Sequence, residues 1–160
     1  MSVVHQAFIC DNRAPDSTAW AKAILDYGFD LVLDPDCSFS SQEGFWPCRY
    51  LGLDAGFEFY RGSLKMFRGE LAKNGRDFTS AELAVLGDAD LVVEFVTHSW
   101  ADDLASAVIS AGVLAKMTGG CLWFAGNRKL IHSSQAIDWT REQEREIAPL
   151  IEAEKSRPRI

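Results

Sequence analysis

Residues 104–115 constrain the fold more than any other part of this sequence. These 12 residues carry no charge and consist mostly of alanine, serine, glycine and aliphatic side chains. Ser99 and Asp102 precede them with the spacing of a capping box, and Gly119 and Gly120 follow them, so we predict a helix that runs to Met117. A helix without a charged face packs closely on several sides, so it is expected at the centre of the fold. The run is too short to cross a bilayer, which takes about 20 apolar residues, so no membrane span is predicted.

Strand and helix patterns alternate along the rest of the chain. The sequence predicts strands over 3–9, 29–33, 47–51, 56–60, 91–97, 121–124 and 129–132, and helices over 18–27, 64–72, 79–86 and from 140 onward. The turn between the last two strands is placed at Gly126 and Asn127. Each half of the chain therefore contains strand, helix, strand and strand in that order. We predict one α+β domain over residues 1–151, with helices packed on one face of a mainly antiparallel or mixed sheet.

The C-terminal part is predicted to be a charged helix. Thr140 and Gln143 resemble a capping box, so the helix is expected to begin at 140. Pro149 is expected to kink or end it. Residues 152–160 are predicted to be a frayed tail.

Composition indicates a globular chain with an acidic surface. Of the 160 residues, 48% are hydrophobic and 24% are charged, and 23 acidic against 16 basic side chains give a net charge of −7. This charge repels phosphate backbones at long range, so we predict no nucleic-acid partner.

The N-terminus and the cysteines indicate a cytoplasmic protein. The first ten residues have no basic region and no long apolar stretch, so they do not resemble a secretory signal. The four cysteines, at positions 10, 37, 48 and 121, form no C-x-x-C pair and have no histidine at metal-ligand spacing. We therefore expect free thiols and no metal site, with Asp34, Asp36 and Cys37 forming a solvated turn.

No motif of a known catalytic or cofactor site is present. The sequence lacks G-x-G-x-x-G, the P-loop pattern and G-x-S-x-G, so neither a nucleotide cofactor nor a serine nucleophile is predicted. A small enzyme of unknown class remains an alternative hypothesis. Its candidate residues are Cys48, Glu58, Glu94 and His98, and a deep pocket that joins two or more of them would favour it.

Acidic residues and aromatic residues coincide in the first third of the chain. Residues 1–60 contain nine acidic and three basic side chains, a formal charge of −6. The candidate partner-binding residues are Asp34, Asp36, Glu43, Phe45, Trp46 and Asp54. Exposed aromatic side chains supply affinity and carboxylates steer a basic partner, so this combination is typical of a protein-binding surface. In the alternative interpretation, Phe45 and Trp46 belong to the core and the acids only solvate the surface.

Two stretches carry a resemblance to a known protein family. The first is Gly-Phe-Trp-Pro-Cys at 44–48 with Asp-Ala-Gly-Phe-Glu-Phe-Tyr at 54–60, and the second is Leu-Ala-Lys-Met-Thr-Gly-Gly-Cys-Leu-Trp at 114–123. Together they resemble small cytoplasmic immunity proteins encoded beside bacterial polymorphic toxins, including those of Rhs and type VI secretion systems. The resemblance implies a non-enzymatic inhibitor that binds one cognate toxin and occludes its active site or substrate cleft.

The resemblance implies no catalytic residue and no cofactor for this chain. A compact acidic inhibitor can place carboxylates where phosphate groups would lie, so the expected partner is a toxin with a basic substrate-binding cleft. An adaptor or chaperone that binds an effector without inhibiting it is a third hypothesis.

Overall fold

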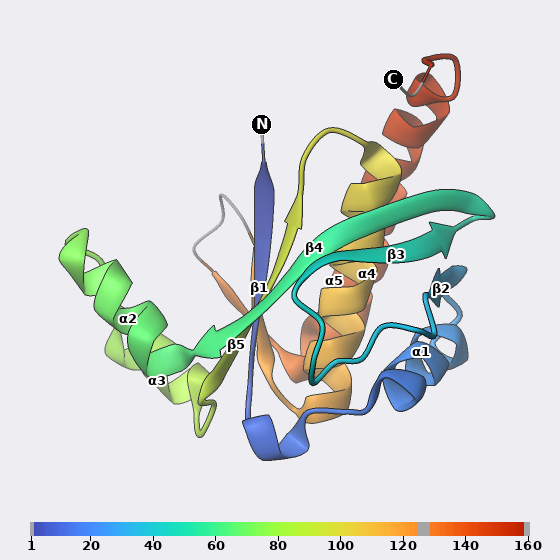
Figure 1. The fold of residues 1–160 in the computed structure, drawn as a ribbon. Helices are drawn as coiled ribbons and strands as arrows, with labels where there is room; N and C mark the ends of the chain where they lie inside the picture. Colours follow the sequence, from blue (N-terminus) through green and yellow to red (C-terminus); the bar gives the residue numbers. More distant parts are fainter. Residues whose placement is uncertain (1, 125–128, 159–160) are drawn as a thin grey trace.

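The uncharged segment forms the central helix, α4 (Ala101–Thr118), whose residues 105–115 are all buried. In this computed structural model, which describes residues 2–124 and 129–158, α4 lies against a seven-stranded sheet (Figure 1). The prediction of a central helix is confirmed. None of the helices in the described residues is both long and apolar enough to span a membrane.

The sheet is antiparallel throughout its described strands. The strands are β1 (Val3–Ile9), β2 (Leu31–Leu33), β3 (Gly44–Tyr50), β4 (Leu53–Ser63), β5 (Leu91–Thr97), β6 (Cys121–Trp123) and β7 (Leu130–His132). The remaining helices are α1 (Ser17–Asp26), α2 (Leu64–Lys73), α3 (Ser80–Leu86) and α5 (Ser133–Glu154), with a 3-10 turn, η1, at Asp11–Arg13. The strand order is β2-β3-β4-β5-β1-β6-β7, and every neighbouring pair is antiparallel. The α+β prediction is confirmed.

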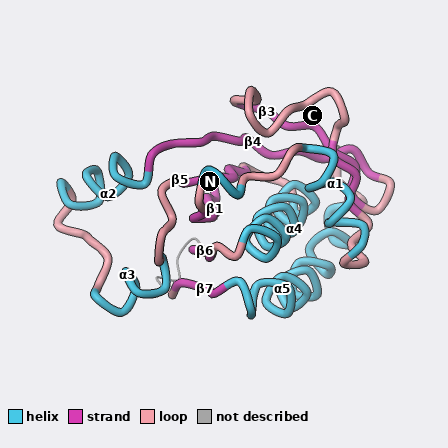
Figure 2. Tube along the Cα trace, turned by 90° about the horizontal axis from the view of Figure 1, so that it is seen from below, coloured by secondary structure: helices cyan, strands magenta, loops and turns pink. Residues whose placement is uncertain are grey.

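Side-chain alternation along the strands divides the apolar residues between two clusters. Ala7 and Ile9 of β1 point toward α1, α4 and α5, where they join the main core, whereas Phe8 points to the opposite face. Helices α2 and α3 cover Phe8 and Val92 there, and Figure 2 shows these two helices well apart from α4 and α5. The prediction that all helices share one face is therefore wrong for α2 and α3. These two helices lie on the other face because β1 and β5 carry apolar side chains on both faces at this end of the sheet.

The β3–β4 hairpin turn is tighter than predicted. The expected strands over 47–51 and 56–60 left a four-residue turn, but β3 and β4 are joined by Leu51 and Gly52 alone, with φ of 51° and 75°. Two successive positive φ values fit the right-handed twist of a two-residue hairpin. Leucine rarely adopts a positive φ, so Leu51 gave no sequence signal for a two-residue turn.

Helix α5 begins earlier and ends later than predicted. It starts at Ser133, where the His132 side chain accepts a hydrogen bond from the Ser134 amide at 3.2 Å, and it passes through Pro149. The proline ring removes one helical N–H, but this turn of α5 is exposed, so water can reach the carbonyl group left without a partner. The helix ends at Glu154, so residues 152–154 are helical rather than frayed.

Glu154 caps the central helix. Its carboxylate accepts a hydrogen bond from the Ala101 amide at 2.8 Å, at the first residue of α4. The predicted cap at Ser99 is wrong, because the residue before α4 is Trp100, whose side chain caps nothing. The predicted turn at Gly126 and Asn127 lies outside the described residues.

We expect Gly112→Ala to destabilise the contact between α4 and α5. A Cβ atom at position 112 would lie 1.8 Å from Oγ1 of Thr140. The two helices would have to move apart to relieve this overlap. Overpacking of this kind costs about 1–3 kcal/mol of unfolding free energy. Denaturant titration measures the loss, and adding Thr140→Ala should restore part of it. Equal stability of Gly112→Ala and the parent chain would contradict this packing.

His5 is expected to make the protein sensitive to acid. The ring is fully buried, stacks on Phe124 with a centroid distance of 4.8 Å, and neither nitrogen has a hydrogen-bond partner among the described residues. Burial lowers the pKa of His5 from 6.5 to about 4. Between these two values the unfolded chain takes up a proton that the folded chain does not, so stability falls as the pH falls from 6.5 to 4.

The matched variant is His5→Phe, which keeps an aromatic ring against Phe124 and cannot be protonated. Over the window from pH 6.5 to 4 the parent should lose about 3 kcal/mol more unfolding free energy than the variant. Denaturant titrations at several pH values give both curves. Parallel curves would show that His5 does not carry this dependence.

Candidate functional site

On the face opposite α4, no helix of the described residues covers strands β3 and β4. The register places Phe45 beside Glu58, Tyr60 beside Glu94, Pro47 beside Gly56 and Arg49 beside Asp54 on this face. We call this surface the open face and define it by Val32, Phe45, Pro47, Arg49, Asp54, Glu58, Tyr60 and Glu94. Three of its apolar or aromatic side chains are substantially exposed: Phe45 by 59%, Val32 by 50% and Tyr60 by 39%. In Figure 1, α4 and α5 lie behind β3 and β4, and no helix lies in front of them.

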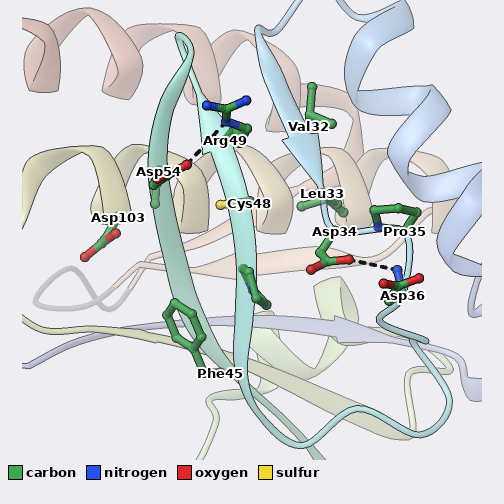
Figure 3. Close-up of a pocket in the computed structure, with 12 residues that line it drawn as sticks. Val32, Leu33, Asp34, Pro35, Asp36, Phe45, Cys48, Arg49, Asp54 and Asp103 are labelled. Atoms are coloured by element: carbon green, nitrogen blue, oxygen red, sulfur yellow. Dashed lines mark hydrogen bonds and ion pairs between the residues drawn. The ribbon is translucent and has the colours of Figure 1, made fainter.

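A groove of about 660 Å³ lies at the β2 end of the open face (Figure 3). We call it the acidic groove. Its lining includes Val32, Asp34, Asp36, Phe45, Pro47, Arg49, Asp54 and Asp103. Four carboxyl groups thus surround the groove, against a single basic side chain. Arg49 forms an ion pair with Asp54, with Nε 3.3 Å from Oδ1.

Pro47 determines where strand β2 ends. The Asp34 amide donates to the Pro47 carbonyl at 3.1 Å, but proline has no N–H to return the second hydrogen bond of the ladder. Pairing with β3 therefore stops at Leu33, and the chain turns. The Asp34 carboxylate stabilises this turn by accepting a hydrogen bond from the Asp36 amide at 2.9 Å. The turn places Asp34 and Asp36 on the rim of the acidic groove.

Gly56 fixes the position of the Phe45 ring. A Cβ atom at Gly56 would lie 2.3 Å from Cζ of Phe45, so the ring occupies the space that any other residue would fill. The Gly56 amide donates a hydrogen bond to Oδ1 of Asp103 at 2.9 Å. Gly56 lies beyond the end of the β4–β5 pairing, which begins at Glu58. Burial raises the pKa of Asp103, although the hydrogen bond from Gly56 opposes this effect.

The structure brings together four of the six predicted partner-binding residues. Asp34, Asp36, Phe45 and Asp54 line the acidic groove, although they come from a loop and two strands. Glu43 is exposed just before β3 but does not line the groove.

Trp46 is wrong as a partner-binding residue. It is fully buried, because it alternates with Phe45 along β3 and points into the main core. There its ring contacts Trp20 and Phe59, with centroid distances of 5.3 and 5.0 Å. The alternative interpretation therefore holds for Trp46, whereas Phe45 lies at the surface.

The residues of the enzyme hypothesis do not form a shielded site. Cys48 is buried in the main core, and burial raises the pKa of its thiol to about 12. Glu58 and His98 do meet, with Oε1 3.1 Å from Nε2, but their side chains are 36% and 59% exposed. The groove lined by Cys48 does not include Glu58, Glu94 or His98, and the cavity lined by His98 includes none of the other three. This exposed arrangement lacks the water exclusion expected of an active site.

A hydrogen-bonded polar cluster occupies the middle of the open face. The Tyr60 hydroxyl donates to Oε2 of Glu58 at 3.1 Å, and the contacts with His98 and Tyr60 lower the pKa of Glu58. Next to it, Nε2 of Gln6 donates to Glu94 at 3.1 Å. Within residues 2–124 and 129–158, no three His, Cys, Asp or Glu side chains form a group that could hold a metal ion. The contacts from Tyr60, His98 and Gln6 orient the carboxylates of Glu58 and Glu94 on this face.

Comparisons of this chain with protein-family models, with curated proteins and with solved structures found no match. The open face presents exposed aromatic side chains and carboxylates, the combination found at many protein-binding surfaces.

The sequence interpretation missed Tyr60 and Asp103. Tyr60 could have been found from the sequence, since alternation along a strand over 56–60 directs Phe57 and Phe59 to one side and Glu58 and Tyr60 to the other. Asp103 gave no such signal, because its place at the groove depends on how α4 meets β4.

Cys48 is expected to be unreactive in the folded protein. With a pKa of about 12 its thiolate population at neutral pH is about a thousandfold or more below that of a free cysteine, and the residue is also buried. Native alkylation with iodoacetamide, followed by peptide mass spectrometry, should modify the partly exposed Cys37 at least about tenfold faster. Fast labelling of Cys48 without unfolding would contradict its placement in the core.

Proposed function

We propose that this chain is a cytoplasmic, non-enzymatic immunity protein that binds one cognate bacterial toxin and neutralises it. Its open face would cover the toxin's active site or substrate cleft. The observation that carries this proposal is the aromatic open face with its acidic groove. The resemblance of residues 44–60 and 114–123 to immunity proteins of Rhs and type VI secretion systems supplies the class of partner.

The open face has the composition of a binding interface. Phe45 and Tyr60 are exposed aromatic side chains near its centre, and such residues contribute much of the binding free energy in protein complexes. Asp34 and Asp36 form no ion pair with any described residue, so their charge is available to a partner. The partner that this surface fits is a protein with a basic cleft.

Charge supports the same partner. A basic cleft that binds phosphate-containing substrates attracts an acidic protein of net charge −7 at long range and accelerates their association. Carboxylates on the rim of the groove would then take the places of substrate phosphates. A toxin that acts on nucleic acids or nucleotides is the partner that this arrangement favours.

The first experiment is co-expression of the chain with the product of a neighbouring candidate toxin gene. Growth rescue together with co-purification is the expected result. A stable complex without rescue would favour an adaptor or chaperone, and the absence of both would overturn the proposal.

Single substitutions on the open face should then weaken the complex. Phe45→Ala and Asp36→Lys change exposed side chains, so the fold should be retained, and each should raise the dissociation constant by about 30-fold or more. Glu146→Lys, at an exposed position of α5, is the charge-matched control, and Met66→Ala, at an exposed position of α2, is the apolar control. Isothermal titration calorimetry measures all four. Unchanged affinity in both open-face variants would exclude this face as the interface.

A further inference from the structure

We infer that the acidic groove receives one arginine side chain of the bound protein, which packs against the Phe45 ring and is attracted by the carboxylates of the rim, Asp36 among them. The inference rests on the proposed function for the source of the arginine. It goes further in naming the chemical group that the groove recognises.

Phe45 provides an exposed aromatic surface. Its ring lies over Gly56, where no side chain lifts it from the sheet, yet 59% of the residue remains exposed. A planar guanidinium can stack on such an exposed ring, and the electron-rich ring face attracts its positive charge.

The floor of the groove suits the methylene part of an arginine side chain. Val32, Phe45 and Pro47 all line the groove, and none of the three side chains carries a polar atom. Arginine buries its three methylene groups on apolar surfaces while its charged end reaches polar partners. The volume of about 660 Å³ is ample for one such side chain.

Among the described residues, the rim of the groove has one basic side chain, Arg49. Arg49 pairs with Asp54, and this contact shows a guanidinium already lying along the rim (Figure 3). The Asp36 carboxylate has neither a hydrogen bond nor an ion pair within residues 2–124 and 129–158. One more guanidinium would therefore meet an uncompensated carboxylate at the open end of the groove.

Arginine fits this groove better than lysine. The guanidinium is planar, is more weakly hydrated than an ammonium group and can bind a carboxylate while it stacks on a ring. An ammonium group is compact and strongly hydrated, so it would use the carboxylates but gain less from Phe45.

The inference is tested with three blocked tripeptides in which glycine flanks arginine, lysine or citrulline. Citrulline has nearly the shape of arginine but no charge. Two-dimensional NMR of the isotope-labelled chain should show shifts of the backbone amides that lie around the groove, those of Asp34, Asp36, Phe45, Cys48 and Arg49. The arginine peptide should bind about threefold or more tightly than the lysine peptide. The citrulline peptide should cause no shifts there.

Phe45→Leu is the matched variant. It keeps an apolar side chain above Gly56 but removes the aromatic ring, so the preference for arginine over lysine should disappear while the spectrum remains that of a folded protein. Asp36→Asn should weaken both charged peptides. Equal binding of arginine and lysine by the parent chain, an unchanged preference in Phe45→Leu, or no shift with any peptide would each overturn the inference.

These outcomes separate the groove from the proposed function. Arginine-selective binding without growth rescue would retain the arginine site and remove the immunity function. Growth rescue that depends on the open face, without a preference for the arginine peptide, would retain the immunity function and remove the arginine site.

Discussion

The enclosure of α4 determines the arrangement of the rest of the molecule. A helix with eleven consecutive buried residues and no charge between 104 and 115 must be covered on every side. The sheet covers one side, and α1 and α5 cover much of the remainder. Small side chains make this possible, because Gly112 lets Thr140 of α5 approach to a distance that no other residue at position 112 would allow. With three helices committed to this face, the β3–β4 half of the opposite face is left without a helix.

The open face is therefore a consequence of how the core is built. Strands β3 and β4 direct Trp46, Phe57 and Phe59 toward α4, and their neighbours Phe45, Glu58 and Tyr60 are directed to solvent by alternation. The large aromatic residues of the core cannot exchange faces without exposing Trp46 and burying Glu58, so the register is strongly fixed. The same register that stabilises the core thus determines which side chains a partner can meet.

Regular elements could be predicted from the sequence where the signal was local. The strands at Val3–Ile9 and Leu91–Thr97 have the predicted bounds, since both are short apolar runs flanked by turn or capping residues. Features that depend on distant contacts could not be predicted. The cap on α4 comes from Glu154, 53 positions along the chain, and it also explains why the C-terminal helix does not fray where expected. The acidic groove is of the same kind, because the aspartates of its rim come from the turn after β2, from β4 and from α4.

The acids of the groove differ in how far the fold itself explains them. Asp34 holds the turn that Pro47 requires, and Asp103 accepts the Gly56 amide beyond the end of the β4–β5 pairing, so both carboxylates satisfy backbone groups at the ends of hydrogen-bonded ladders. Asp54 pairs with Arg49 across the hairpin. Asp36 has no such role within the described residues, and the Phe45 ring gains little from more than half exposure in a folded monomer. Folding accounts for Asp34, Asp54 and Asp103, whereas the proposed partner, which would bring a positive charge and a flat surface to the same place, would account for Asp36 and Phe45.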